Sequence, residues 1–201
     1  APEGNWAGVG ERLIVADKLA GDMFTAARVE GWRKVRTVEP SELSGLACAH
    51  PLRGAEGADG FWDDDVPVLE GDFVTDDQGT GFVHMAPSHG EDDYELFRRT
   101  GMLEAITHNV DEAGTFRAHV PFFAGTQIID AKGRDGGANG AVIAKLAEAG
   151  ALVARGRKTI SDAHSWRSKA PVIRLNRPQW FVAIDHPLED GMGEHGRTIR
   201  E

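Results

Sequence analysis

Two histidines and three consecutive acidic residues lie close together in one short segment, Gly79–Tyr94 (GTGFVHMAPSHGEDDY). They are His84, His89, Glu91, Asp92 and Asp93. A carboxylate in such a cluster can bind an ammonium group, orient a water molecule or act as a general base. This segment is therefore the strongest candidate for a site that carries chemistry.

The residues around the cluster predict a strand, a loop and a helix in that order. A glycine turn at residues 79–81 leads into Phe82–Met85, which is typical of a buried β-strand. Glu91–Thr100 has acids in its first turn, arginines in its last turn and Gly101 just beyond, which indicates a helix. Because strand side chains alternate, His84 and the next residue should point to opposite faces.

The cluster by itself leaves several interpretations open. Zinc binding by His84 and His89 lacks a cysteine, a third histidine and the helical His-x-x-x-His spacing, so we expect no metal. A triad of Ser88, His89 and Asp92 is disfavoured, because triad partners meet in space and no Gly-x-Ser-x-Gly elbow is present. In a purely structural interpretation, the acids favour the helix dipole and His84 is a hydrogen-bonded core histidine. Residue chemistry alone favours this last interpretation.

The glycine-rich segment Gly133–Gly140 (GRDGGANG) precedes a second predicted helix at Ala141–Ala149 and superficially resembles a phosphate-binding loop. Neither Gly-x-Gly-x-x-Gly nor Gly-x-x-x-x-Gly-Lys is present. We therefore expect a flexible turn with Asn139 as the helix cap.

Short apolar stretches elsewhere predict further strands. They are expected at Arg12–Ala16, Phe73–Thr75, within His119–Ile129, at Pro171–Leu175 and at Gln179–Ile184. Strands and helices do not alternate regularly along the chain. The predicted fold class is α+β, with a curved or barrel-like β-sheet core and peripheral helices.

The composition is that of a globular protein, with 201 residues, 41% hydrophobic and 27% charged. Cys48 is the only cysteine, which excludes an intrachain disulfide and favours a reducing compartment. No apolar run approaches the roughly 20 residues that cross a bilayer, and no signal peptide is recognisable. We expect a cytoplasmic protein without membrane contact. Because Ala1 and Glu201 carry no terminal signal, we also expect a segment of a longer chain.

Charge is distributed unevenly. Residues 1–150 hold 13 Lys and Arg against 26 Asp and Glu, whereas residues 151–201 hold 9 against 6. Acidic surface repels phosphate, which excludes non-specific nucleic-acid binding by most of the chain. A basic stripe is formed by Arg155, Arg157, Lys158, Arg167, Lys169, Arg174 and Arg177. Composition leaves open whether this basic stripe contacts a nucleic-acid backbone or balances acidic neighbours.

The segment Gly79–Tyr94 closely resembles the editing (CP1) domain of bacterial isoleucyl-tRNA synthetases, which is inserted into the catalytic Rossmann fold of these enzymes. The similarity continues through residues 45–51 (GLACAHP), 71–75 (GDFVT), 138–146 (ANGAVIAKL), 164–173 (HSWRSKAPVI) and 177–182 (RPQWFV). Valyl and leucyl editing domains share the Gly-Thr-Gly turn, but His84 and the His89–Asp93 run fit the isoleucyl pattern best. The resemblance implies the editing-domain fold, with an editing body at 1–160 and a β-rich connector at 161–201 that returns toward the catalytic domain.

The resemblance also implies a reaction, in which water hydrolyses the ester that joins valine to tRNA(Ile). It implies that Asp93 binds the α-ammonium of the misattached amino acid, and that His84 lies in a small pocket that admits valine and excludes isoleucine. These two residues are the expected catalytic-site residues. Gly79, Thr80 and Gly81 are expected to contact the terminal adenosine or the developing oxyanion. No metal or other cofactor is expected.

One part of the family pattern is absent, because the sequence contains no Thr-Thr pair and so lacks the threonine-rich segment of these domains. The ATP-binding signatures of the synthetases are absent as well, so this chain is not expected to activate isoleucine. The expected partners are the acceptor end of tRNA(Ile) carrying valine and the catalytic domain of the parent synthetase, with the chain a monomer. The alternative hypothesis is a non-catalytic module that positions tRNA through the basic stripe or braces a larger enzyme, the fragment itself being inactive.

Overall fold

The computed structural model describes residues 8–77, 79–130, 132–155 and 163–185. Within these residues the one sheet is a pair of antiparallel strands, β1 (Ala47–Ala49) and β2 (Asp65–Pro67). In their register, Ala47 lies opposite Pro67 and Ala49 lies opposite Asp65. The described part of the chain thus belongs to the mixed α+β class, as predicted, but it contains no curved sheet or barrel.

Two short helices precede the sheet, and neither was predicted. In α1 (Ala20–Ala26) the buried residues Ala20 and Met23 are followed by buried Ala27, a spacing that places one apolar side against the body. In α2 (Pro40–Leu43) proline occupies the start of the helix, where its missing N–H is harmless. The Glu42 carboxylate accepts the Glu39 N–H at 2.9 Å, as half of a capping box.

The two predicted helices are confirmed with small changes at their ends. α3 (Glu91–Arg99) ends one residue before the predicted end and is followed by Gly101 at φ 74°. α4 (Ala138–Glu148) begins three residues earlier than predicted. The N-cap of α4 is Gly137 at φ 97°, so the expectation that Asn139 caps this helix is wrong.

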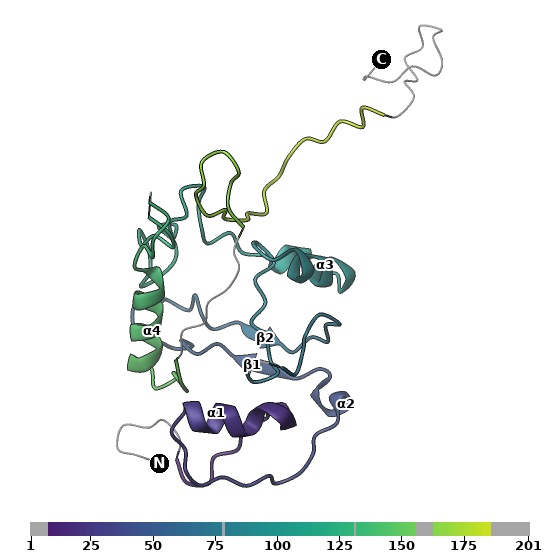
Figure 1. The fold of residues 1–201 in the computed structure, drawn as a ribbon, viewed down its shortest axis with the longest axis vertical. Coiled ribbons are helices and arrows are strands. Elements are labelled where there is room, and N and C mark those ends of the chain that lie inside the picture. The colour runs from purple at the N-terminus through teal and green to yellow at the C-terminus, as the bar shows by residue number, and fades with distance from the viewer. Residues whose placement is uncertain (1–7, 78, 131, 156–162, 186–201) are drawn as a thin grey trace, which may run out of the picture.

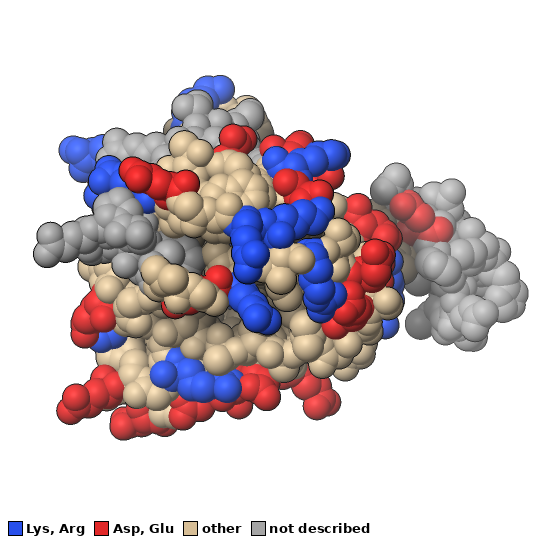
Figure 2. Space-filling model, turned by 90° about the horizontal axis from the view of Figure 1, so that it is seen from below, with Lys and Arg blue, Asp and Glu red and all other residues tan. Residues whose placement is uncertain are grey.

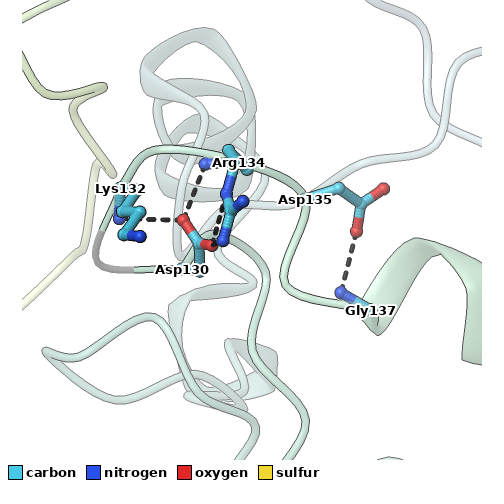
Figure 3. Close-up of polar contacts among 5 residues, drawn as sticks. All are labelled: Asp130, Lys132, Arg134, Asp135 and Gly137. Atoms are coloured by element: carbon cyan, nitrogen blue, oxygen red, sulfur yellow. Dashed lines mark hydrogen bonds and ion pairs between the residues drawn. The ribbon is translucent and has the colours of Figure 1, made fainter.

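A carboxylate-centred loop precedes α4 and explains its early start (Figure 3). The Asp130 carboxylate accepts backbone N–H groups from Lys132 and Arg134 as well as two guanidinium N–H groups of Arg134. These hydrogen bonds, those from Arg134 first, lower the pKa of Asp130. Asp135 then accepts the Gly137 N–H at 2.8 Å, which orients the chain into the helix. The glycine-rich segment is therefore a structured turn organised by aspartates.

The hydrophobic core lies where α4 meets the segments around residues 52 and 120. Leu52, Val120 and Phe123 are 3%, 0% and 4% exposed. Partly buried apolar residues surround them, namely Ala55, Phe61, Trp62, Phe116, Ala141, Val142 and Leu146. Because these residues come from the middle of the chain and from α4, the core joins segments that are far apart in sequence.

None of the predicted stretches forms a strand in the described residues, and β1 and β2 were not predicted. Arg12–Ala16 is joined to the glycine turn by the bond from the Ala16 N–H to the Thr80 carbonyl, and Phe82–Met85 forms no ladder. His119–Ile129 forms isolated bridges and turns, and Phe73–Thr75, Pro171–Leu175 and Gln179–Ile184 form no strand. An apolar stretch becomes a strand only where a second stretch offers matching backbone groups. Among the described residues, these stretches meet a partner at isolated positions only, as Gln127 does with Thr115 and Pro171 with His164.

Two parts can be distinguished in Figure 1, the body (residues 8–155) and the arm (residues 163–185). In the body, α1 lies below the sheet while α3 and α4 lie on opposite sides of the view (Figure 1). The arm begins with a turn closed by a bridge between His164 and Pro171, and its end extends away from the body. The predicted boundary at residue 160 lies outside the described residues. No helix within the described ranges has both the length and the apolar character needed to cross a bilayer.

Candidate functional site

The predicted glycine turn is present and packs against the N-terminal segment. Gly79 and Gly81 have φ of 72° and 85°, a conformation that glycine adopts without strain. The Ala16 N–H donates to the Thr80 carbonyl at 2.8 Å. A Cβ on Gly81 would lie 2.6 Å from the Ala16 Cβ, so close packing as well as backbone conformation favours glycine here.

His84 lies exposed after this turn, whereas the next residue, Met85, is half-buried. Phe82 and Val83 are exposed as well, so burial does not alternate along this segment, and the exposure of His84 excludes its interpretation as a core histidine. Burial lowers the pKa of His50, and the nearby charge of His84 lowers it further. The His50 ring stacks on Trp62 with centroids 4.5 Å apart, and its Nδ1 accepts the Leu52 N–H at 3.1 Å. His84 is thus electrostatically coupled to a histidine at the edge of the core.

Asp93 is the third residue of α3 and is half-buried. Its Oδ2 accepts the Ala86 N–H at 2.8 Å, so the carboxylate folds back over the loop that precedes the helix. A Cβ on Gly90 would lie 2.5 Å from this oxygen, which explains the small residue at that position. Within the described residues no hydrogen bond or ion pair occupies Oδ1 of Asp93. One carboxylate oxygen therefore fixes the loop, and the other is available to a ligand.

The loop between His84 and Asp93 is held by several hydrogen bonds. The N–H groups of His89 and Gly90 both donate to the Ala86 carbonyl at 2.8 Å. Ser88 is 6% exposed, and its hydroxyl donates to the Thr107 carbonyl. A buried hydroxyl with its hydrogen bond made holds the loop on the neighbouring segment.

The arm docks onto this same loop. The His89 ring Nδ1 lies 2.8 Å from the Arg174 carbonyl oxygen, and the Asn176 N–H donates to the Ser88 carbonyl at 2.8 Å. A carbonyl oxygen only accepts hydrogen bonds, so His89 Nδ1 carries the hydrogen. Two segments more than 80 residues apart in sequence are thereby joined at one point.

Two cavities of about 230 and 270 Å³ flank this junction. Both are lined by Ser88, His89, Leu175 and Asn176, the first also by residues of α3 and the second by residues 108–117 and 177–178. Neither lining includes His84, Asp93 or the glycine turn. The roles inferred for those residues from family resemblance therefore remain predictions.

The residues of the second cavity were missed as a site by sequence reasoning. Besides the loop they include His108, Glu112, Arg117 and Arg177. Only Arg177 was predicted to have a role, as part of the basic stripe. The other three residues form no recognisable sequence motif with the loop. Their proximity results from tertiary packing.

The basic stripe is only partly described, because residues 156–162 lie outside the described ranges. Arg167 lies over the exposed ring of Trp166 at 5.0 Å, and Arg177 pairs with Glu112 at 3.2 Å. Figure 2 shows a different face, seen from below the view of Figure 1, on which Lys and Arg side chains gather near the middle with Asp and Glu among and around them. Across the described residues, no three His, Cys, Asp or Glu side chains are grouped so that they could hold a metal ion.

Similarity to known proteins extends over the whole chain. The chain is 53% identical over 203 residues to an isoleucine–tRNA ligase of Ruegeria pomeroyi, and the match covers 100% of this chain and 21% of that protein. Ligases of the same name from Bradyrhizobium diazoefficiens and Caulobacter vibrioides are 46% and 49% identical, over 100% and 98% of this chain and 20% of each protein. No family model matches the chain. The chain is therefore homologous, along its length, to a segment that makes up about a fifth of isoleucine–tRNA ligases.

Proposed function

We propose that this chain is the editing domain of an isoleucine–tRNA ligase and hydrolyses the ester of valine wrongly attached to tRNA(Ile). The observation that carries the proposal is the homology to isoleucine–tRNA ligases over the entire chain, including the Gly79–Tyr94 segment. The ligase, its catalytic domain and the tRNA acceptor end are the partners that this function requires. As a segment of such an enzyme, the chain acts as a monomeric unit in the cytoplasm.

In this proposal the Asp93 carboxylate recognises the α-ammonium group that every aminoacyl ester carries. The Ala86 N–H at 2.8 Å fixes the direction of the carboxylate and leaves Oδ1 for the ligand. A hydrogen bond between an ammonium and a carboxylate is roughly twice as strong as a neutral one. The substrate ester is thereby held in one orientation, which favours attack by water.

In this proposal His84 supplies the size limit. It is an exposed residue that stands in the sequence between the glycine turn and the loop that Asp93 holds. One methylene in a hydrophobic pocket is worth only about 1–3 kcal/mol, a limit for which isoleucine and valine on these synthetases are the standard example. The proposed editing site is smaller than the site that selects isoleucine for attachment, so it admits valine and sterically excludes isoleucine. Thr80 and the N–H groups of Gly79 and Gly81 contact the terminal adenosine or the oxyanion that develops on the ester in this proposal.

The site requires a further element, since neither described cavity includes His84 or Asp93. We assign that role to the threonine-rich segment of the family, which this sequence does not contain. Water is the only co-reactant that ester hydrolysis needs, so the reaction is chemically complete without a cofactor.

The test is hydrolysis of valyl-tRNA(Ile) by the full-length ligase, comparing Asp93→Asn with Asp92→Asn. Both variants remove one charge from the first turn of α3, and an amide at 93 can still accept the Ala86 N–H. We expect Asp93→Asn to slow hydrolysis about tenfold or more, the effect of losing one charge-assisted hydrogen bond. Asp92→Asn should hydrolyse at the wild-type rate, and both should activate isoleucine normally. Equal rates for the two variants contradict the role of Asp93.

A second candidate function is a non-catalytic module that positions tRNA. It is favoured by the exposure of Trp166, 76%, with Arg167 over its ring, an arrangement suited to stacking on a base. In that case Arg167→Gln weakens tRNA binding with a reduced salt dependence, while Asp93→Asn leaves hydrolysis unchanged.

A further inference from the structure

The second cavity is formed by three segments that are distant in sequence. Its lining combines the loop at Ser88 and His89, residues 108–117, and the arm at residues 175–178. Its volume of about 270 Å³ lies just below the roughly 300–1,000 Å³ that is typical of small-molecule sites. The space therefore suits a small group, such as one phosphate with part of its attached molecule.

Hydrogen-bond donors dominate the polar part of this lining. The lining includes Arg117, Arg177, His89 and His108 and a single carboxylate, that of Glu112. Within the described residues no ion pair or side-chain hydrogen bond involves the Arg117 guanidinium. An arginine whose donors are unused presents a planar fork that matches the oxygens of a phosphate or carboxylate.

His89 is held in a defined orientation at the edge of this cavity. Its Nδ1–H donates to the Arg174 carbonyl at 2.8 Å, which leaves Nε2 as the ring atom that can meet a ligand. The bond from the Asn176 N–H to the Ser88 carbonyl fixes the same junction between the loop and the arm at a second point. This junction is thus ordered before any ligand binds, which reduces the entropy cost of binding.

The ion pair between Arg177 and Glu112 is the adjustable part of the lining. Arg177 Nη2 and Glu112 Oε1 are 3.2 Å apart, and the two side chains are 55% and 56% exposed. A pair this exposed contributes little to stability, so an anion can displace Glu112 from Arg177 at small cost. Arg177 and Arg117 can then bind the same anion from two sides.

We propose that this cavity is a binding site for a phosphate group, with Arg117 and Arg177 as its charged ligands and His108 as a further donor, while His89 Nε2 can accept a hydrogen bond from a protonated phosphate oxygen. The phosphate belongs either to a small phosphorylated molecule or to an RNA backbone. The site is separate from Asp93, so it does not depend on the hydrolytic function proposed above.

The test is hydrogen exchange of the full-length ligase, measured on peptides covering residues 86–91, 108–117 and 174–178, during titration with inorganic phosphate. We expect phosphate to slow exchange in these peptides. Arg117→Gln should weaken the apparent affinity about tenfold or more, as expected for loss of a charge-assisted contact. Glu112→Gln should strengthen it by up to about fivefold, because the competing carboxylate is removed.

Arg98→Gln is the matched control, since Arg98 pairs with Glu95 on the exposed side of α3 and is outside the cavity lining. A second titration uses an uncharged tRNA acceptor minihelix in place of phosphate. Protection by both, with mutual competition, supports an RNA phosphate, and protection by inorganic phosphate alone supports a small phosphorylated ligand. Absence of protection by either, or an equal response of Arg117→Gln and Arg98→Gln, overturns the proposal. Valyl-tRNA(Ile) hydrolysis by the same variants is scored separately, so failure of one proposal leaves the other measurable.

Discussion

The body and the arm of this protein are held together by different forces. The body has a packed core in which Val120 has no exposed surface and Leu52 and Phe123 have almost none. The arm ends in residues such as Trp180 and Phe181, which are 100% and 88% exposed. It is attached to the body by a backbone hydrogen bond at Ser88, by a hydrogen bond from the His89 ring to the Arg174 carbonyl, by the exposed ion pair of Arg177 with Glu112, and by local packing. The body is therefore stabilised by apolar burial, and the arm by a few specific contacts.

The two cavities lie at the junction of the body and the arm, so their shape depends on how firmly the arm is attached. The loop that carries His89 belongs to the body, whereas Leu175 and Asn176 belong to the arm. A change that detaches the arm should open the cavities while leaving the core intact. Three substitutions test this division, from the largest expected effect to the smallest.

Leu52→Ala should destabilise the body strongly. Leu52 is 3% exposed and packs with Val120 and Phe123, so its removal leaves a cavity and costs about 2–5 kcal/mol of unfolding free energy. Denaturant unfolding of the 201-residue chain measures the change. Leu103→Ala, at a position 41% exposed, is the control and should cost less than about 1 kcal/mol. Equal losses would show that the core is not where the stability of the body resides.

Gly114→Ala should loosen the arm more than it destabilises the core. Gly114 has φ 72°, and an added Cβ would lie 2.6 Å from Ile173 Cδ1. Gly125 has φ 78° with nothing within 4 Å of such a Cβ, so Gly125→Ala carries the same backbone cost of about 1–2 kcal/mol without the contact.

The readout is the rate of tryptic cleavage after Arg174, which we expect to rise only in Gly114→Ala. Adding Ile173→Ala to that variant relieves the overlap and should bring cleavage back to the level of Gly125→Ala. Identical cleavage in Gly114→Ala and Gly125→Ala would show that the arm is not held at this point.

Trp180→Ala should leave the unfolding free energy of this chain unchanged to within about 0.5 kcal/mol. The side chain is fully exposed and follows Arg177, which pairs with Glu112 of the body. Thermal unfolding followed by circular dichroism provides the measurement. A clear fall in the midpoint would mean that the end of the arm packs on the body in solution.

Local sequence signals predicted the helices well and the strands poorly. The charge order of Glu91–Arg99 and the glycine after it determine α3 without help from distant residues. A strand depends on a partner that a local pattern does not contain, which is why Arg12–Ala16 and Gln179–Ile184 were wrongly predicted as strands. The capping box at Glu39 and Glu42, with Pro40 between them, is a local signal for the start of α2.

The sequence by itself determined the homology to isoleucine–tRNA ligases, the α+β class, the glycine turn and the helix that carries Asp93. All of these depend on residue types at short spacing, where backbone conformation and the helix dipole act directly. Only the tertiary structure decided that Asp93 bonds to the Ala86 N–H, that His84 is exposed, and that Arg117 lines a cavity with Arg177. These outcomes depend on packing between segments tens of residues apart, and short-range patterns contain no information about which of those segments will meet.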